Sequence, residues 1–282
     1  MVTALFLLLF LLPSACPLLA VDPLIFLSGG LSASLSHSLT VPIDVVKTRQ
    51  QQDPRFEGSE GLLANARTIV ENEGLAKLFA GSLPTLTGYF LQGSLKYGFY
   101  DAFKPLTNGL TESGLANLIV AAGLAELIGT TVLTPLEASR IKQVTDPAFA
   151  DLNFLETVRS QSVESSLSSL QPCLLKMLPY TMMQLSSYEV MRSSSVPQIP
   201  AALISAVVSS LASQPGDALL SYSAKGSGGF DLARGLTDLG VAGLFRGTQA
   251  RLLQMILIVS VQLLANDTIR ASLGLAVVGA VK

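Results

Sequence analysis

The segment Pro42-Ile43-Asp44-Val45-Val46-Lys47-Thr48-Arg49 decides the fold of this 282-residue chain. It follows an apolar segment rich in small residues, 24–41, and a proline at the end of such a segment kinks a membrane helix. Asp44 and Lys47 lie three residues apart, so they share one helical face. Charges at the end of a membrane helix are costly unless they pair or reach water. Taken alone, the segment also fits a helix end with a solvated salt bridge.

The segment does not stand alone, because its motif recurs twice. Pro135-Leu136-Glu137-Ala138-Ser139-Arg140-Ile141-Lys142 has the same order of proline, acid, base and base, and Pro215-Gly216-Asp217 repeats the first half. The three prolines are 93 and 80 residues apart. Copies at such intervals indicate an internal repeat. We expect repeats over residues 22–110, 111–196 and 197–282.

The composition is that of a membrane protein. Hydrophobic residues make up 49% of the chain and charged residues 13%, whereas an average soluble domain carries roughly 25% charged residues. The mean hydropathy is +0.52. A net charge of −2 gives no basic footprint for nucleic acid. Cys16 and Cys173 have no metal-site or disulfide spacing, and no nucleophile–base set or P-loop is found, so we expect no metal, no cofactor and no enzyme activity.

Six long helices are predicted, at about 22–51, 83–104, 115–143, 174–192, 197–225 and 247–270, with surface helices at about 59–72, 151–160 and 230–239. Residues 1–21 are predicted to form an apolar leader, either signal-like or an uncleaved extension. Every even-numbered long helix ends in acid-x-x-base. One such pair is an ordinary helical ion pair worth a few tenths of a kcal/mol, but three equivalent pairs indicate a shared role. The pairs are Asp101/Lys104, Glu189/Arg192 and Asp267/Arg270.

This set of motifs resembles that of the mitochondrial carrier family over roughly residues 24–275, and Glu73-Gly74 matches its acid-glycine element. The resemblance implies an all-α membrane protein with six transmembrane helices. They would form three tandem two-helix repeats with short surface helices, arranged as a pseudo-threefold bundle around a central cavity. It also implies two salt-bridge gates that close in turn. One gate would contain Asp44, Lys47, Glu137, Arg140 and Asp217, and the other the three acid-x-x-base pairs.

Within the family, the local sequence is similar to phosphate carriers. The matching segments are Gly88-Tyr89, Gln92-Gly93, Lys96-Tyr97-Gly98-Phe99-Tyr100 and Pro179-Tyr180-Thr181-Met182-Met183. The resemblance implies a monomer in the mitochondrial inner membrane, surrounded by lipids. It would carry inorganic phosphate, with protons or in exchange for hydroxide, by alternating access.

Departures from the phosphate-carrier pattern leave alternatives open. Gln184 stands where a lysine is expected, Asn266 replaces the aromatic residue before Asp267, and the pI of about 5.5 is low. Another small anion or a metal ion could be the cargo, or the chain could be a membrane adaptor that transports nothing. A plastid envelope or a secretory-pathway membrane remain alternative locations.

A phosphate anion in a cavity of low dielectric constant needs cations and neutral hydrogen-bond donors. Gln92 and Lys96 are four residues apart and share one helical face. The resemblance places Lys176 where the family contacts its substrate. We therefore predict substrate binding by Gln92, Lys96 and Lys176.

Proton coupling needs groups that titrate inside the membrane. His37 is the only side chain whose ordinary pKa lies near neutrality, and Glu126 is a carboxylate in the middle of a predicted membrane helix. We predict a proton relay between them, with Glu137 and Asp217 nearer the gate. Glu137 is expected to lack an ionic partner, because Leu220 occupies the position of the missing gate base.

Overall fold

The computed structural model describes residues 21–52, 61–145, 148–149, 154–159, 163–225, 232–245 and 248–278. Apart from Val21, the expected leader therefore lies outside the described residues. The described part of the chain is helical and contains no strand. Its elements are α2 (Pro23–Gln52), α3 (Leu62–Glu73), η3 (Leu75–Phe79), α4 (Ser82–Thr107), α5 (Gly114–Thr145), α6 (Phe154–Arg159), α7 (Val163–Ser193), α8 (Gln198–Lys225), α9 (Leu232–Leu244) and α10 (Thr248–Ser272).

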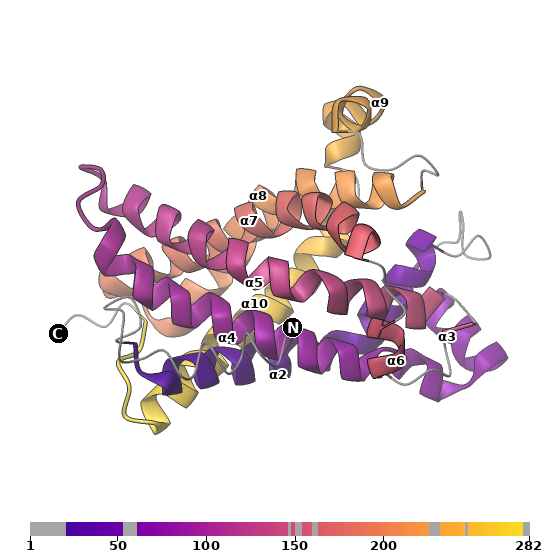
Figure 1. Cartoon of the computed structure of the whole chain (residues 1–282), viewed down its shortest axis with the longest axis horizontal. Helices are drawn as coiled ribbons and strands as arrows, with labels where there is room; N and C mark the ends of the chain where they lie inside the picture. The colour runs from indigo at the N-terminus through magenta and orange to yellow at the C-terminus, as the bar shows by residue number, and fades with distance from the viewer. Residues whose placement is uncertain are drawn as a thin grey trace.

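The six long helices run side by side (Figure 1), and their contacts close them into a ring. Around the ring the contacts run α2–α4–α5–α7–α8–α10 and back to α2. The short helices α3, α6 and α9 pack against α2, α5 and α8, the three helices that contain the repeated prolines. This arrangement confirms the predicted all-α six-helix fold.

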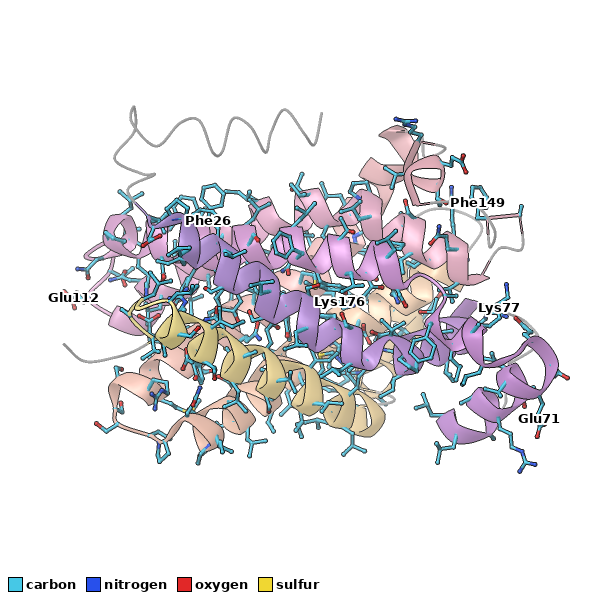
Figure 2. All side chains as sticks on the ribbon, turned by 90° about the horizontal axis from the view of Figure 1, so that it is seen from below. Phe26, Glu71, Lys77, Glu112, Phe149 and Lys176 are labelled. Atoms are coloured by element: carbon cyan, nitrogen blue, oxygen red, sulfur yellow. The ribbon has the colours of Figure 1, made fainter. Side chains whose placement is uncertain are left out.

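The two ends of the bundle differ. Glu71 and Lys77, on α3 and η3, lie at one end, and Glu112, between α4 and α5, lies at the other (Figure 2). We refer to the first as the proline end, because Pro42, Pro135 and Pro215 precede the helix ends on that side. The second is the far end, where α4, α7 and α10 finish.

Four of the long helices contain a segment long and apolar enough to cross a membrane: Pro23–Arg49, Gly114–Val144, Gln198–Leu219 and Arg251–Ser272. Helices α4 and α7 do not reach that hydropathy, because polar side chains such as Gln92, Lys96 and Gln184 are buried on their inner faces. Polar residues of membrane helices face the bundle interior or a water-filled cavity. The lower hydropathy of α4 and α7 therefore follows from the interior that they line.

Helices α2 and α4 approach so closely that Gly93 and Gly98 of α4 have no room for a side chain of their own. A Cβ atom on Gly93 would lie 2.4 Å from Ala33 Cβ and 2.5 Å from the carbonyl oxygen of Gly29. A Cβ atom on Gly98 would lie 2.2 Å from the ring of Phe26. Small residues allow this backbone approach in membrane helices. The close contact holds the polar faces of α2 and α4 toward the same interior space.

The fourth long helix begins earlier than predicted. The expected start at about residue 174 is wrong, because α7 begins at Val163 and continues through both Pro172 and Pro179. Proline is tolerated inside membrane helices where neighbouring groups satisfy the freed backbone carbonyl.

Candidate functional site

A cavity of about 140 Å³ lies inside the ring, between the middle of the bundle and the proline end. All six long helices contribute side chains to its wall. One water molecule needs about 10–15 Å³ by this kind of measure, so the cavity has room for a small hydrated ion. Its titratable lining residues are His37, Asp44, Lys47, Tyr89, Lys96, Glu137, Arg140, Lys176, Tyr180, Asp217 and Arg251.

The charges on the cavity wall do not cancel. Five basic side chains and three acidic ones line it, a surplus of two positive charges when His37 is neutral. An excess of like charge in a space of low dielectric constant attracts a counter-ion, because uncompensated buried charge is costly. The charge of the wall therefore favours an anion over a cation in this cavity.

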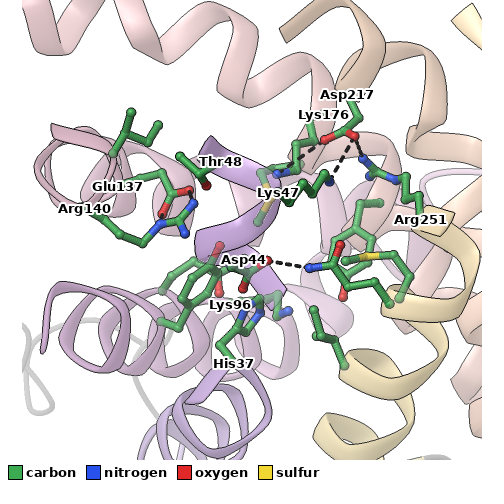
Figure 3. Close-up of a pocket in the computed structure, with 18 residues that line it drawn as sticks. His37, Asp44, Lys47, Thr48, Lys96, Glu137, Arg140, Lys176, Asp217 and Arg251 are labelled. Atoms are coloured by element: carbon green, nitrogen blue, oxygen red, sulfur yellow. Dashed lines mark hydrogen bonds and ion pairs between the residues drawn. The ribbon is translucent and has the colours of Figure 1, made fainter. Parts of the chain in front are cut away.

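Three of the five basic side chains surround one carboxylate, that of Asp217 (Figure 3). Lys47 Nζ lies 3.5 Å and Lys176 Nζ 3.7 Å from its two oxygens, and Arg251 contacts it as well. Arg251 also donates a hydrogen bond of 2.8 Å to Ser213 Oγ. A single negative charge is shared by three cations, so this cluster alone carries two uncompensated positive charges.

Lys96 is a separate cation at the inner end of the cavity. Its side chain is almost fully buried, and within the described part of the chain no carboxylate lies within ion-pair distance of it. Nζ donates a hydrogen bond of 3.3 Å to Gln184 Oε1. The rings of Tyr97 and Tyr180 lie 5.2 and 5.7 Å from Nζ and offer weak cation–π contacts. The ammonium is thus held mainly by neutral groups.

The structure brings the three predicted substrate-binding residues together, since Gln92, Lys96 and Lys176 all line this cavity. It separates the two residues of the predicted relay. His37 lines the cavity and stacks on Tyr89, with ring centroids 3.4 Å apart and an interplanar angle of 6°.

Glu126 lies behind the cavity wall, fully buried between α4, α5 and α7. Gln92 Nε2 donates to both of its carboxylate oxygens, at 3.0 and 2.9 Å. The hydroxyls of Thr130 and Thr181 donate to it at 2.5 and 2.6 Å. Since Gln92 also lines the cavity, its amide separates the Glu126 carboxylate from the cavity.

The expectation that Glu137 lacks an ionic partner is wrong. Arg140, one turn further along α5, donates from Nη2 and Nε to its two oxygens at 2.6 and 3.0 Å. Asp44 accepts hydrogen bonds from the amide of Gln254 and, at 3.3 Å, from Thr40. Among the residues predicted to form the gate at the proline end, Lys47 and Asp217 form an ion pair between two helices, α2 and α8.

The three acid-x-x-base motifs that were predicted to form the far gate lie near the ends of α4, α7 and α10. Lys104 Nζ lies 2.9 Å from Asp101 and 3.2 Å from Glu189, and Arg270 lies 2.8 Å from Asp101. These pairs tie α4 to α7 and to α10, and none of their residues lines the cavity. At the far end, ion pairs thus connect α4 with α7 and with α10.

The two remaining charged residues of the predicted far gate, Arg192 and Asp267, take other partners instead of each other. Asp267 accepts hydrogen bonds from Tyr188 OH at 2.5 Å, Gln198 Nε2 at 3.5 Å and the backbone N–H of Val278 at 3.4 Å. Arg192 donates instead to the carbonyl oxygen of Val196 at 3.0 Å. Charge spacing along each helix identified both residues, but it did not indicate which partner each would take.

Two further wall residues, Tyr89 and Gln254, were not predicted from the sequence. Gln254 follows Arg251 by three residues on α10, so helical spacing from that buried arginine is a signal that points to it. Tyr89 precedes Lys96 by seven residues, two turns along the same face of α4.

Comparison with known proteins agrees with this architecture. The family model for the mitochondrial carrier protein matches residues 23–110. The chain is 32% identical over 279 residues to "Mitochondrial substrate carrier family protein N" of Dictyostelium discoideum, covering 88% of this chain and 93% of that protein. It is 29% identical to the "Probable mitochondrial phosphate carrier protein" of Schizosaccharomyces pombe, over 90% of this chain and 91% of that protein. It is 26% identical to "Solute carrier family 25 member 3" of Homo sapiens, over 86% of this chain and 74% of that protein. Because the similarity extends over nearly the whole of the first two relatives, this chain belongs to the mitochondrial carrier family, whose members are membrane transporters.

Proposed function

We propose that this protein transports inorganic phosphate across the mitochondrial inner membrane by alternating access. The observation that carries the proposal is the surplus of two positive charges on the cavity wall. Inorganic phosphate is a mixture of the singly and doubly charged anions near neutral pH, so its charge lies between one and two negative units and is balanced by that surplus. The relative in Schizosaccharomyces pombe that bears a phosphate carrier's name supports the same substrate.

Gln92, Lys96 and Lys176 are the proposed substrate-binding residues, and Arg251 joins them. Lysine suits a compact oxyanion that must be released again, because its ammonium acts as a point charge rather than a bidentate clamp. Asp217 occupies Lys176 and Arg251 in the empty protein. An arriving phosphate would displace this internal carboxylate and take over its cations.

Proton coupling is assigned to His37 and Glu126, with Glu137 and Asp217 nearer the proline end. His37 Nδ1 is buried and has no hydrogen-bond partner among the described residues, so it has a free position for a proton. Glu126 is held by neutral donors alone within the described part, so no ion pair would have to break when it is protonated. Proton symport and hydroxide exchange move the same net charge and remain the two forms of this coupling.

The gates would open in turn. Lys47–Asp217 joins α2 to α8 at the proline end, and Lys104–Glu189 and Asp101–Arg270 join α4 to α7 and α10 at the far end. A two-state transporter needs a preference of only a few kcal/mol between its states. Ion pairs that form in one state and break in the other supply a preference of this size.

Another small anion is the second candidate cargo, because the same charge surplus would attract it. A metal cation fits poorly, since the surplus would repel it. An adaptor without transport would not need ion pairs at both ends of a charged cavity. The proposal is tested best by transport itself.

The test is uptake of radiolabelled phosphate into proteoliposomes, with and without an inward-acid pH gradient. Wild-type protein is expected to show uptake that the gradient accelerates, and Lys96→Ala is expected to lose it. His37→Ala and Glu126→Gln should keep phosphate–phosphate exchange but lose the response to the gradient. Arg67→Ala is the matched control, because it removes an exposed cation of α3 far from the cavity. Absence of uptake by folded wild-type protein would overturn phosphate as the substrate.

A further inference from the structure

Three buried polar residues occupy equivalent positions in the three repeats. Lys96, Gln184 and Gln262 lie on α4, α7 and α10, and they are 1%, 0% and 1% exposed. Each stands five residues before the acid of its far-gate motif, about 7.5 Å along the helix axis from that acid. The three therefore form a polar layer between the cavity and the far gate. The gate acids are Asp101, Glu189 and Asp267.

Hydrogen bonds connect this layer on two of its three sides. Lys96 Nζ donates to Gln184 Oε1 at 3.3 Å, and Gln184 Nε2 donates to Gln262 Oε1 at 3.4 Å. The direction of both bonds follows from Lys96, because an ammonium group only donates. The amide oxygen of Gln184 must face Lys96, so its NH₂ group faces Gln262. One helix from each repeat is linked in this way.

The third side of the layer is open for a chemical reason. After these two bonds, Gln262 is left with its NH₂ group, and Nε2 is buried without a hydrogen-bond partner. Lys96 can still donate two of its three N–H bonds. Both residues that border the open side are donors, so they cannot bond to each other. Buried donors without an acceptor are rare and costly, so the open side calls for an acceptor atom.

The layer borders the cavity, so an anion in the cavity is a possible source of this acceptor. Lys96 lines the cavity, whereas Gln184 and Gln262 lie beyond its wall toward the far end. An anion that enters from the Asp217 cluster and reaches Lys96 has therefore arrived at the layer that contains the free NH₂ group of Gln262. Hydrogen bonds from one ammonium and one amide to a single oxygen suit an oxyanion.

We propose that the open side of the Lys96–Gln184–Gln262 layer is an oxyanion subsite, in which Lys96 Nζ and Gln262 Nε2 bind one oxygen of the phosphate. This inference rests on the proposed function and extends it, because it adds Gln262 as a substrate-binding residue. It also gives the substrate two stations, the cations around Asp217 and then this layer.

The subsite also connects binding with the far gate. Lys96 shifts toward the anion, because a charged acceptor makes the stronger hydrogen bond, and its bond of 3.3 Å to Gln184 Oε1 lengthens. That weakens a link between α4 and α7, the two helices that the Lys104–Glu189 pair joins farther along. An anion in the subsite thus weakens the connection that holds the far end closed.

The test compares phosphate transport by Gln262→Met and by wild-type protein in proteoliposomes. Methionine keeps the unbranched shape of glutamine and removes the donor. We expect KM for phosphate to rise about tenfold, which corresponds to about 1.4 kcal/mol, with kcat within a factor of about two. Gln184→Glu should also raise KM, because phosphate must then displace a carboxylate from Lys96. Gln171→Leu is the matched control, since Gln171 is an exposed glutamine on α7, and it should leave KM unchanged.

The outcomes separate the two proposals. If folded wild-type protein neither transports phosphate nor is stabilised by it against heat, the proposed function fails and the subsite fails with it. If wild-type protein transports phosphate and Gln262→Met leaves KM unchanged, or lowers kcat alone, the subsite is refuted and the proposed function stands. Should Gln262→Met not fold, Gln262→Glu decides in the same assay, because an acceptor at this position must weaken phosphate binding if the subsite exists.

Discussion

Replacing Asp217 by asparagine should destabilise the empty protein and at the same time strengthen phosphate binding. Asp217 is nearly buried, and its carboxylate is the shared partner of Lys47, Lys176 and Arg251. Asparagine has almost the same shape, but it leaves the three cations without their negative charge. Folding and substrate binding should therefore respond in opposite directions.

The magnitude follows from the surroundings of the carboxylate. Removing one partner of a buried ion pair costs about 3–5 kcal/mol. The side chains of Lys47 and Lys176 are 29% and 25% exposed, so solvent screens part of the repulsion, and we expect a loss of about 3 kcal/mol. For a chain of this size, that lowers Tm by roughly 5 °C.

Phosphate should reverse most of that loss. In Asp217→Asn the anion no longer competes with an internal carboxylate, so it binds more tightly. A ligand at 100 times its Kd stabilises the folded state by about 2.7 kcal/mol. At equal phosphate concentration, the increase in Tm should therefore be larger in the variant than in wild-type protein. Transport should nevertheless be lost, because Asp217 also forms the ion pair between α2 and α8.

The assay is thermal unfolding of the purified protein in detergent across a phosphate titration. Asp238→Asn on α9 is the control, because it breaks an exposed ion pair of 3.8 Å with Arg234 and should change Tm by less than about 1 °C. If phosphate raised the Tm of Asp217→Asn no more than that of wild-type protein, Asp217 would not be occupying the anion site.

Three further predictions concern packing, the far gate and the buried carboxylate. Gly93→Val should lower the free energy of unfolding by about 1–3 kcal/mol, because the new Cβ would lie 2.4 Å from Ala33 Cβ. Gly123→Ala should lower it little, because the nearest atoms, those of Met182, lie 3.5 Å from the new Cβ. Equal losses in thermal unfolding would contradict the close approach of α2 and α4. Lys104→Gln removes the ion pairs with Asp101 and Glu189. A cysteine introduced beside the cavity should then react faster with a membrane-impermeant thiol reagent added from the far side. An unchanged rate would show that these pairs do not close that end. Thr181→Val should cost about 1.5–3 kcal/mol, because it leaves the buried Glu126 without the hydroxyl that donates to it at 2.6 Å. Thr131→Val, at an exposed residue bonded to its own helix, should cost less than about 0.5 kcal/mol, and similar effects would mean that the bond between Thr181 and Glu126 does not stabilise the fold.

Features that depend on spacing along the chain could be predicted from the sequence. The repeated proline motifs, the acid-x-x-base pairs and the apolar segments between them indicated six long helices and three surface helices. Helical periodicity placed Gln92 and Lys96 on one face, and both line the cavity. These features are local, because a helix determines which of its own residues share a face without reference to any neighbour.

Partnerships between helices were decided by the tertiary structure alone. The sequence did not indicate that Asp217 would gather three cations, that Glu126 would lie behind Gln92, or that Gln184 would join Lys96 to Gln262. The Glu137–Arg140 pair is different, because both residues lie on α5 three positions apart, so helical spacing alone could have predicted it. Ion pairs and hydrogen bonds need atoms within about 3–4 Å, and those distances depend on how closely and at what register the helices pack. Glycines such as Gly93 set that packing, and only the assembled ring shows which polar groups it brings into contact.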